Sequence, residues 1–205
     1  MRVVGISGAQ GGGKSSLLNE LKGRGYEVDE FRVSRAVQAQ LGWASLDRVM
    51  SSFETMTTFQ EEVFKQKYEN DLALAKIPSH GMILTERTFM DVYAYAQSWT
   101  WKFVDEGIDF EVGSRWLSAY SRKCMSAQME CYAGTILLPL MDHVVFENDP
   151  HRAKKEDAAR VYEEVASVAQ RLKFSGHQSF VLSAKSIHDR ADQVEGYLKL
   201  VKKND

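Results

Sequence analysis

The sequence predicts an α/β fold with a doubly wound, five-stranded parallel sheet and helices on both of its faces. Short β-rich runs alternate with amphipathic segments along the chain, which is the pattern of parallel strands joined by right-handed crossovers. A glycine-rich string directly follows the first of these runs. The length of 205 residues, with 44% hydrophobic and 26% charged residues, suits one soluble globular domain.

The predicted strands are short runs rich in β-branched and aromatic residues, and each is bounded by glycine, proline or polar residues. The first run stops at a string of glycines, and Pro78 and Gly81 precede the third. Such runs without alternation predict buried strands. The strands are expected at residues 2–7, 26–31, 82–85, 143–146 and 179–182.

The predicted helices are longer segments whose apolar residues recur at helical spacing. Leucines at positions 17, 18 and 21 share one face, and Gly23 and Gly42 lie where two of the helices should end. A segment at 103–113 reads as a loop. The helices are expected at residues 14–23, 34–41, 52–76, 89–102, 114–137, 156–173 and 187–202.

Charge and cysteine content exclude several classes of function. The net charge of −2 gives no general electrostatic case for nucleic acid or a membrane surface as partner. Cys124 and Cys131 are the two cysteines, without zinc-ligand spacing, so a reducing cytoplasmic location is expected. No stretch is long and apolar enough to span a bilayer. A homodimer is kept as an alternative to a monomer.

The string GAQGGGKS at residues 8–15 matches the phosphate-loop motif GxxxxGK[ST] in full. Glycines let backbone N–H groups approach phosphate oxygens, and the following helix directs its positive end at the anion. Lys14, an exposed loop charge in this interpretation, can reach the outer phosphates, and Ser15 can ligate Mg²⁺. The motif predicts the P-loop NTPase fold. The expected ATP-binding residues are Gly8, Gly11, Gly12, Gly13, Lys14, Ser15 and Ser16.

With this loop as its first motif, the chain resembles the P-loop nucleoside and nucleotide kinases. These include thymidylate kinases, deoxynucleoside kinases and phage deoxynucleoside monophosphate kinases. The phosphate loop is specific, and the three other motifs that carry the resemblance are short. The resemblance implies ATP and Mg²⁺ as cofactors and a small-molecule nucleotide as partner. It also implies one kinase domain over residues 1–205, with a lid at about 148–160.

The second motif is Thr85-Glu86-Arg87-Thr88 at the end of the third strand. It is similar to the acidic residue followed by Arg in these kinases, which implies that Glu86 acts on Mg²⁺ or on the acceptor's proton. Arg87 would pair with a phosphate. The alternative is an ion pair at the strand end, and Thr88 with Asp91 suits a helix capping box in either case.

Two further strings resemble acceptor-binding motifs of the same kinases. After the second strand, Glu30 is implied as a base or an orienting group, and Arg32 and Arg35 as ligands of a substrate phosphate. A solvated run of charges is the alternative. On the long helix, Gln60 of Phe59-Gln60 is implied to read a base edge, because an amide both donates and accepts.

The last expected site is an arginine-bearing lid at residues 148–160. A closing arginine stabilises charge on the transferring phosphoryl group and excludes water. Arg152 is the first choice for this catalytic role and Arg160 the second. The alternative is a solvated loop before a helix.

Together these residues predict ATP-dependent phosphoryl transfer to a small nucleotide, with a deoxynucleoside monophosphate as first choice. The catalytic residues are expected to be Lys14, Glu86, Arg152 and Glu30. Two alternatives stay open: a kinase that phosphorylates a free deoxynucleoside, and a P-loop ATPase or switch without a small acceptor. The latter usually carries an apolar run ending in Asp, and residues 82–86 are an imperfect version of it.

Overall fold

The computed structural model of the chain describes residues 2–77, 81–140 and 155–203. Five parallel strands form one sheet in the order β2-β3-β1-β4-β5, which confirms the predicted fold class. The central strand β1 pairs with β3 on one side and with β4 on the other. The strands are β1 (Arg2–Ser7), β2 (Glu27–Asp29), β3 (Met82–Glu86), β4 (Gly134–Leu137) and β5 (Ser179–Val181).

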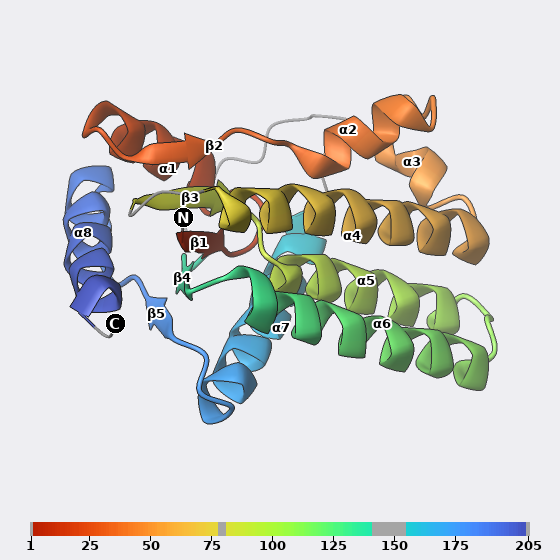
Figure 1. Cartoon of the computed structure of the whole chain (residues 1–205). Helices are drawn as coiled ribbons and strands as arrows, with labels where there is room; N and C mark the ends of the chain where they lie inside the picture. The colour runs from red at the N-terminus through yellow and green to blue at the C-terminus, as the bar shows by residue number, and fades with distance from the viewer. Residues whose placement is uncertain (1, 78–80, 141–154, 204–205) are drawn as a thin grey trace.

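Helices connect the strands and cover both faces of the sheet (Figure 1). The helices begin and end within a few residues of the predicted positions, except at the C-terminal end of α6. The short helix α3 was not predicted. The helices are α1 (Lys14–Gly23), α2 (Val33–Gln40), α3 (Leu46–Val49), α4 (Phe53–Lys76), α5 (Phe89–Asp105), α6 (Phe110–Cys131), α7 (Lys155–Phe174) and α8 (Ile187–Lys203).

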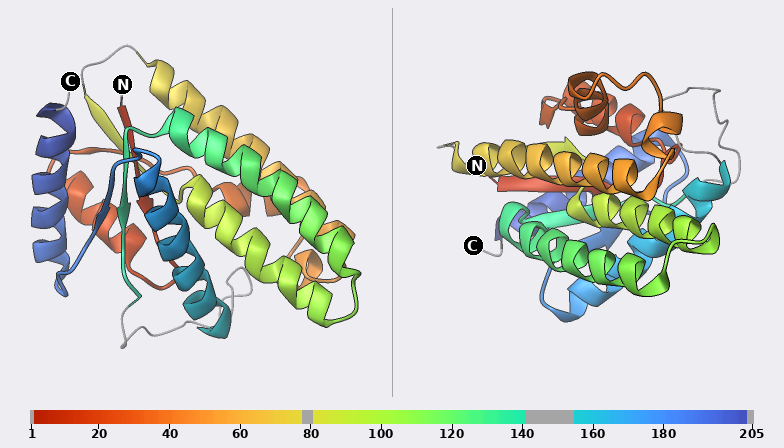
Figure 2. Two further views of the ribbon diagram at one scale, coloured as in Figure 1. Left: turned by 90° about the horizontal axis from the view of Figure 1, so that it is seen from below. Right: turned by 90° about the vertical axis from the view of Figure 1, so that its right-hand side faces the viewer.

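The two faces of the sheet bury separate hydrophobic clusters. Alternate residues of β1 point to opposite faces: Val3 belongs to the cluster of α2, α4, α5, α6 and α7, whereas Val4 and Ile6 belong to the cluster of α1 and α8. The long helices α4, α5 and α6 lie side by side and extend beyond the sheet on the side where β3 ends (Figures 1 and 2). This extension provides a wall beside the carboxyl edge of the sheet, where ligands of such sheets bind.

The fourth strand corrects one prediction. A single helix was expected over 114–137, but α6 ends at Cys131 and residues 134–137 form β4. These four residues are fully buried between β1 and β5, and a Cβ at Gly134 would lie 2.3 Å from the Tyr197 hydroxyl. Pairing in the sheet therefore overrides the helical pattern that precedes it. The strand expected at 143–146 lies outside the described residues.

None of the helices in the described ranges is long and apolar enough to cross a membrane.

Candidate active site

The phosphate loop joins β1 to α1 at the centre of the sheet's carboxyl edge. Gly8, Gly11 and Gly13 all have positive φ angles, of 139°, 83° and 84°. A side chain at Gly8 would also collide with the chain, because its Cβ would lie 2.6 Å from the Leu138 carbonyl oxygen. The glycines of the motif are therefore required by the backbone conformation and by close approach to the segment after β4.

The loop presents unused backbone donors at the start of α1. Within the described part of the chain, the N–H groups of Gly13, Lys14, Ser15 and Ser16 find no acceptor. The first N–H groups of a helix have no partner inside it and carry a partial positive charge. A phosphate group is the ligand that such an arrangement binds best.

Lys14 lies inside the loop rather than exposed on it, which corrects the sequence-based expectation. Its side chain is 5% exposed, and Nζ donates to the carbonyl oxygens of Gly8 at 2.7 Å and Ala9 at 2.9 Å. Burial lowers the pKa of Lys14, whereas the nearby carboxylates of Asp91 and Glu86 oppose that shift. The ammonium group thus lies where the loop, β1 and β3 meet.

Glu86 connects the end of β3 to the start of α1. Its Oε2 accepts a hydrogen bond of 2.9 Å from the Ser15 hydroxyl. Burial would raise the pKa of Glu86, but Lys14, Arg87 and the Ser15 hydroxyl outweigh burial and lower it, with a smaller contribution from Arg32. The carboxylate is therefore ionised at neutral pH beside a hydroxyl oxygen.

These two oxygens fit the ligand chemistry of Mg²⁺. The ion prefers hard oxygen ligands and is usually bound by one or two protein groups together with substrate phosphates. Ser15 and Glu86 supply a hydroxyl and a carboxylate at the mouth of the phosphate loop. Elsewhere in the described ranges, no cluster of three or more histidine, cysteine or acidic side chains could hold a metal ion.

Arg87 adopts a backbone conformation that is rare for a residue with a side chain. Its φ is +65°, and it is the one non-glycine residue with positive φ among those described. The Arg87 N–H donates to the Ile6 carbonyl at 2.9 Å, and the guanidinium carbon lies 5.1 Å from the ring centroid of Tyr95. Such strain persists where surrounding contacts enforce it and is concentrated at functional sites.

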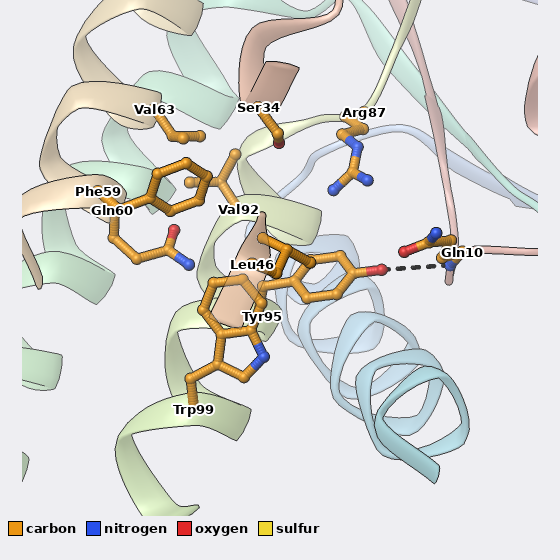
Figure 3. A pocket seen from close by; sticks show the side chains of 10 residues that line it. All are labelled: Gln10, Ser34, Leu46, Phe59, Gln60, Val63, Arg87, Val92, Tyr95 and Trp99. Carbon is orange, nitrogen blue, oxygen red and sulfur yellow. Dashed lines mark hydrogen bonds between the residues drawn. The ribbon is translucent and has the colours of Figure 1, made fainter. Parts of the chain in front are cut away.

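A pocket opens directly beyond Arg87 (Figure 3). Aromatic and aliphatic side chains form most of its wall, and polar groups enter from opposite sides: the Gln60 amide from α4 and the Arg87 guanidinium from the end of β3. The Tyr95 hydroxyl accepts a 3.3 Å bond from the backbone N–H of Gln10, which ties the pocket to the phosphate loop. The lining residues are Gln10, Ser34, Leu46, Phe59, Gln60, Val63, Arg87, Val92, Tyr95 and Trp99.

Gln60 is held firmly while its amide faces the pocket. The residue is 2% exposed, its backbone carbonyl accepts a 2.6 Å bond from the Tyr120 hydroxyl, and its Oε1 lies 3.4 Å from the same hydroxyl. Phe59 beside it packs against Trp99, with ring centroids 6.3 Å apart. An apolar pocket with a fixed amide is suited to a flat heterocycle that has donors and acceptors on its edge.

The structure does not bring every expected acceptor residue to this pocket. Glu30 is exposed and accepts a 2.6 Å bond from Lys22 of α1. Arg32 is exposed but near enough to influence the pKa of Glu86. Arg35 is exposed and is not among the lining residues, where Ser34 stands instead. The charge run passes from the end of β2 at Asp29 into α2, which begins at Val33, so its side chains do not share one face.

The expected lid is described only in part. Arg152 lies outside the described residues, and so does most of the segment 148–160. Arg160 is exposed on α7. Whether either arginine acts in a lid stays a prediction.

Several residues of the site were not predicted as such. Thr88 and Asp91 form the expected capping box, but Asp91 also accepts 2.8 Å bonds from the Ser7 hydroxyl and from the Gly8 N–H, so it fixes the start of the phosphate loop. Tyr95 and Trp99 lie on the pocket side of α5. With Val92 they follow the spacing i, i+3, i+7, which is the signal that could have placed them on one face.

A sequence model of a family described as AAA domain matches residues 3–190. The chain belongs to this family. A comparison with curated protein sequences found no match.

Three solved structures share this fold. A deoxyadenosine kinase from M. mycoides, solved with products dCMP and dCDP, has a TM-score of 0.70 and 12% identity, over 96% of this chain and 98% of that one. A thymidylate kinase from Candida albicans has a TM-score of 0.67 and 11% identity, over 100% and 93%. The NadR protein in complex with NR has 0.68 and 14%, over 96% of this chain and 51% of that one. The fold is therefore that of P-loop nucleoside and nucleotide kinases.

Proposed function

We propose that the protein transfers the γ-phosphoryl group of ATP to a small nucleotide, most directly a deoxynucleoside monophosphate. One observation carries the proposal: two consecutive residues face two different sites. Glu86 bonds to Ser15 of the phosphate loop, whereas Arg87 lines the aromatic pocket. The donor phosphates and an acceptor in the pocket would therefore meet at this strand end.

The chain's own groups would act mainly by positioning and electrostatics, as phosphoryl transfer requires. The loop's N–H groups and Lys14 would bind the donor phosphates. Ser15 and Glu86 would hold Mg²⁺, which neutralises charge on the phosphates when bound. Gln60 would orient the acceptor through its base edge, and the aromatic wall would exclude water.

A phosphate-bearing acceptor is favoured by the groups in the pocket. A free nucleoside hydroxyl needs a base to remove its proton, whereas a phosphate oxygen is already an anion. Among the described residues that line the pocket, none is a carboxylate or a histidine. The Arg87 guanidinium is present instead, and it can pair with a phosphate through two hydrogen bonds.

Four further residues would act only if the chain closes over a bound acceptor. They are Glu30, Arg32, Arg35 and the lid arginine Arg152.

A cytoplasmic location is part of the same proposal. It is supported by Cys124 and Cys131, which are both free and buried in α6. Thiols of this kind suit a reducing compartment.

Two alternatives rest on specific observations. Glu86 is ionised and close to the pocket, so it could serve as base for a free deoxynucleoside. The AAA domain family description favours ATP hydrolysis without an acceptor. An aromatic pocket that opens beside the phosphate loop argues for an acceptor, since hydrolysis uses only water.

ADP release from Mg·ATP, measured with and without deoxynucleoside monophosphates, tests the proposal. We expect release to depend on the acceptor, with the matching deoxynucleoside diphosphate as second product. Lys14→Ala should lower the rate by roughly a hundredfold or more, because it removes a preorganised donor to the phosphates. The control Lys199→Ala, which removes an exposed lysine of α8, should keep the native rate. Equal ADP release without any acceptor would favour the ATPase alternative.

A further inference from the structure

Arg190 of α8 is a buried cation that touches the phosphate loop. Its side chain is 4% exposed. Nη1 donates to the Gly12 carbonyl oxygen at 3.0 Å, and Nε donates to the Ala184 carbonyl oxygen at 3.0 Å. The guanidinium thus joins the phosphate loop to the turn between β5 and α8, although these segments are almost the whole chain apart.

The contact with Gly12 has a consequence for the next residue. In a trans peptide the C=O and the N–H point in opposite directions. The Gly12 carbonyl is directed at Arg190, so the N–H of Gly13 is directed away from α8. That N–H is one of the loop donors without an acceptor among the described residues.

The close packing around Gly13 also indicates that Arg190 controls the orientation of the loop backbone. Its φ is +84°, and a Cβ placed on it would lie 3.3 Å from Nη1 of Arg190. The loop backbone and the guanidinium therefore pack tightly against each other, and the orientation of the 12–13 peptide is coupled to the position of the Arg190 side chain.

We propose that Arg190 is a positioning residue, which aims the Gly13 N–H at the phosphates of the bound nucleotide by holding the Gly12 carbonyl. The proposal rests on the proposed function only in that ATP binds at the phosphate loop. Arg190 itself need not touch the nucleotide.

The unused part of the guanidinium argues against a purely structural role. Nη2 is buried and has no hydrogen-bond partner among the described residues. An unpaired buried donor is destabilising, and more so when it is charged. A side chain that served only to attach α8 is expected to satisfy all its donors, and local departures from this rule are typical of functional sites.

The attachment of α8 to α1 already has other polar contacts. Arg24, the C-cap residue of α1, donates to Asp192 at 2.6 Å and to Glu195 at 3.3 Å, and Glu20 of α1 bonds to His188 at 2.9 Å. Arg24 therefore offers a matched control: it joins the same two helices but does not contact the phosphate loop.

The test compares Arg190→Met, Arg190→Lys and Arg24→Gln by calorimetric titration with Mg·ATP and with inorganic tripolyphosphate. Arg190→Met should raise the Kd of both ligands by roughly tenfold or more, because one phosphate donor is misdirected. Arg190→Lys should recover part of this loss, since an ammonium can still donate to the Gly12 carbonyl. Arg24→Gln should lower the unfolding temperature and leave both Kd values unchanged.

A second measurement needs no substitution at Arg190. In the ¹⁵N-labelled native protein, tripolyphosphate should shift the Gly13 amide proton downfield as a new hydrogen bond forms. A folded Arg190→Met variant with native Kd values, or a Gly13 amide that does not respond while the Ser15 amide does, would overturn the role of Arg190 alone. A native protein that binds neither ligand would overturn the ATP site as well.

Discussion

At the scale of single residues, the site depends on the turn that follows β3. The positive φ of Arg87 directs two successive side chains to different places, Glu86 to Ser15 and Arg87 to the pocket. A residue other than glycine is strained in this region, so the conformation must be stabilised by its surroundings. The bond from the Arg87 N–H to the Ile6 carbonyl and the packing on Tyr95 provide that stabilisation.

Glu86→Gln tests the role of the carboxylate at this scale. Glutamine keeps the size and one acceptor for Ser15 but loses the charge, so kcat should fall roughly a hundredfold or more while the Kd of ATP stays within about threefold. Lys14, Arg87 and the Ser15 hydroxyl outweigh burial and lower the pKa of Glu86, so the native carboxylate takes up a proton at a lower pH than an ordinary glutamate does. Steady-state kinetics and circular dichroism are the measurements. An unchanged kcat in a folded variant would mean that Glu86 is only an ion-pair partner.

Arg87→Ala tests how the acceptor is held. We expect the KM of the monophosphate to rise about ten- to a hundredfold, with the KM of ATP nearly unchanged, because a charge-assisted contact contributes about 1.5–3 kcal/mol. Arg115→Ala is the control, since Arg115 is exposed on α6 and does not line the pocket. An equal effect of the two substitutions would show that Arg87 is not the phosphate ligand.

Site residues that belong to a local sequence motif could be predicted, whereas those brought together from distant parts of the chain could not. The phosphate loop and the Glu86–Arg87 pair follow strands directly, so a local motif places them. Gln60 was placed by resemblance and lies in the pocket. Arg190 contacts Gly12 of the loop, which is 178 residues away in the sequence, and no local pattern predicts such a contact.

At the scale of secondary-structure elements, a buried polar network joins α4 to β3 and β2. Lys67 is fully buried, and its Nζ donates to Asp71 at 3.0 Å and to Thr85 at 2.8 Å. Thr85 in turn donates to Asp29 at 3.1 Å, and the Tyr132 hydroxyl donates to Asp71. The network fixes Thr85, the residue immediately before Glu86, so it stabilises the end of β3.

Lys67→Met should therefore cost about 3–5 kcal/mol of unfolding free energy, because it leaves the Asp71 carboxylate buried without its cation. Adding Asp71→Asn should recover part of the loss, since the amide is neutral and still accepts from Tyr132. Urea unfolding followed by circular dichroism measures both. A single variant within about 1 kcal/mol of the native protein would contradict this account of the network.

The prediction of β4 as part of a helix shows a limit of sequence periodicity. Few polar or helix-breaking residues separate α6 from residues 134–137, so the helical pattern was extended into β4. A short apolar run is ambiguous between the two states, and pairing with β1 and β5 decides it. The strands β1 and β3 were predicted well because glycines or a proline bound them and their residues are β-branched or aliphatic.

At the scale of the whole molecule, the sheet separates two sets of helices, with α1 and α8 on one face and α2, α4, α5, α6 and α7 on the other. The α1 and α8 side carries Arg190, which contacts the phosphate loop, and the α4 and α5 side carries the pocket with Gln60 and Trp99. The substrates would therefore approach the carboxyl edge from opposite sides of β1 and β3. This arrangement is what in-line transfer between two bound phosphates needs.

The central claim is that the acceptor already carries a phosphate. ADP release with thymidine, deoxycytidine and their monophosphates at equal concentration tests it most directly. The monophosphates should be phosphorylated faster, because a free nucleoside leaves the Arg87 guanidinium without its partner in the pocket. Faster phosphorylation of the free nucleosides would contradict the claim and would assign the base to Glu86, while the ATP site would stand.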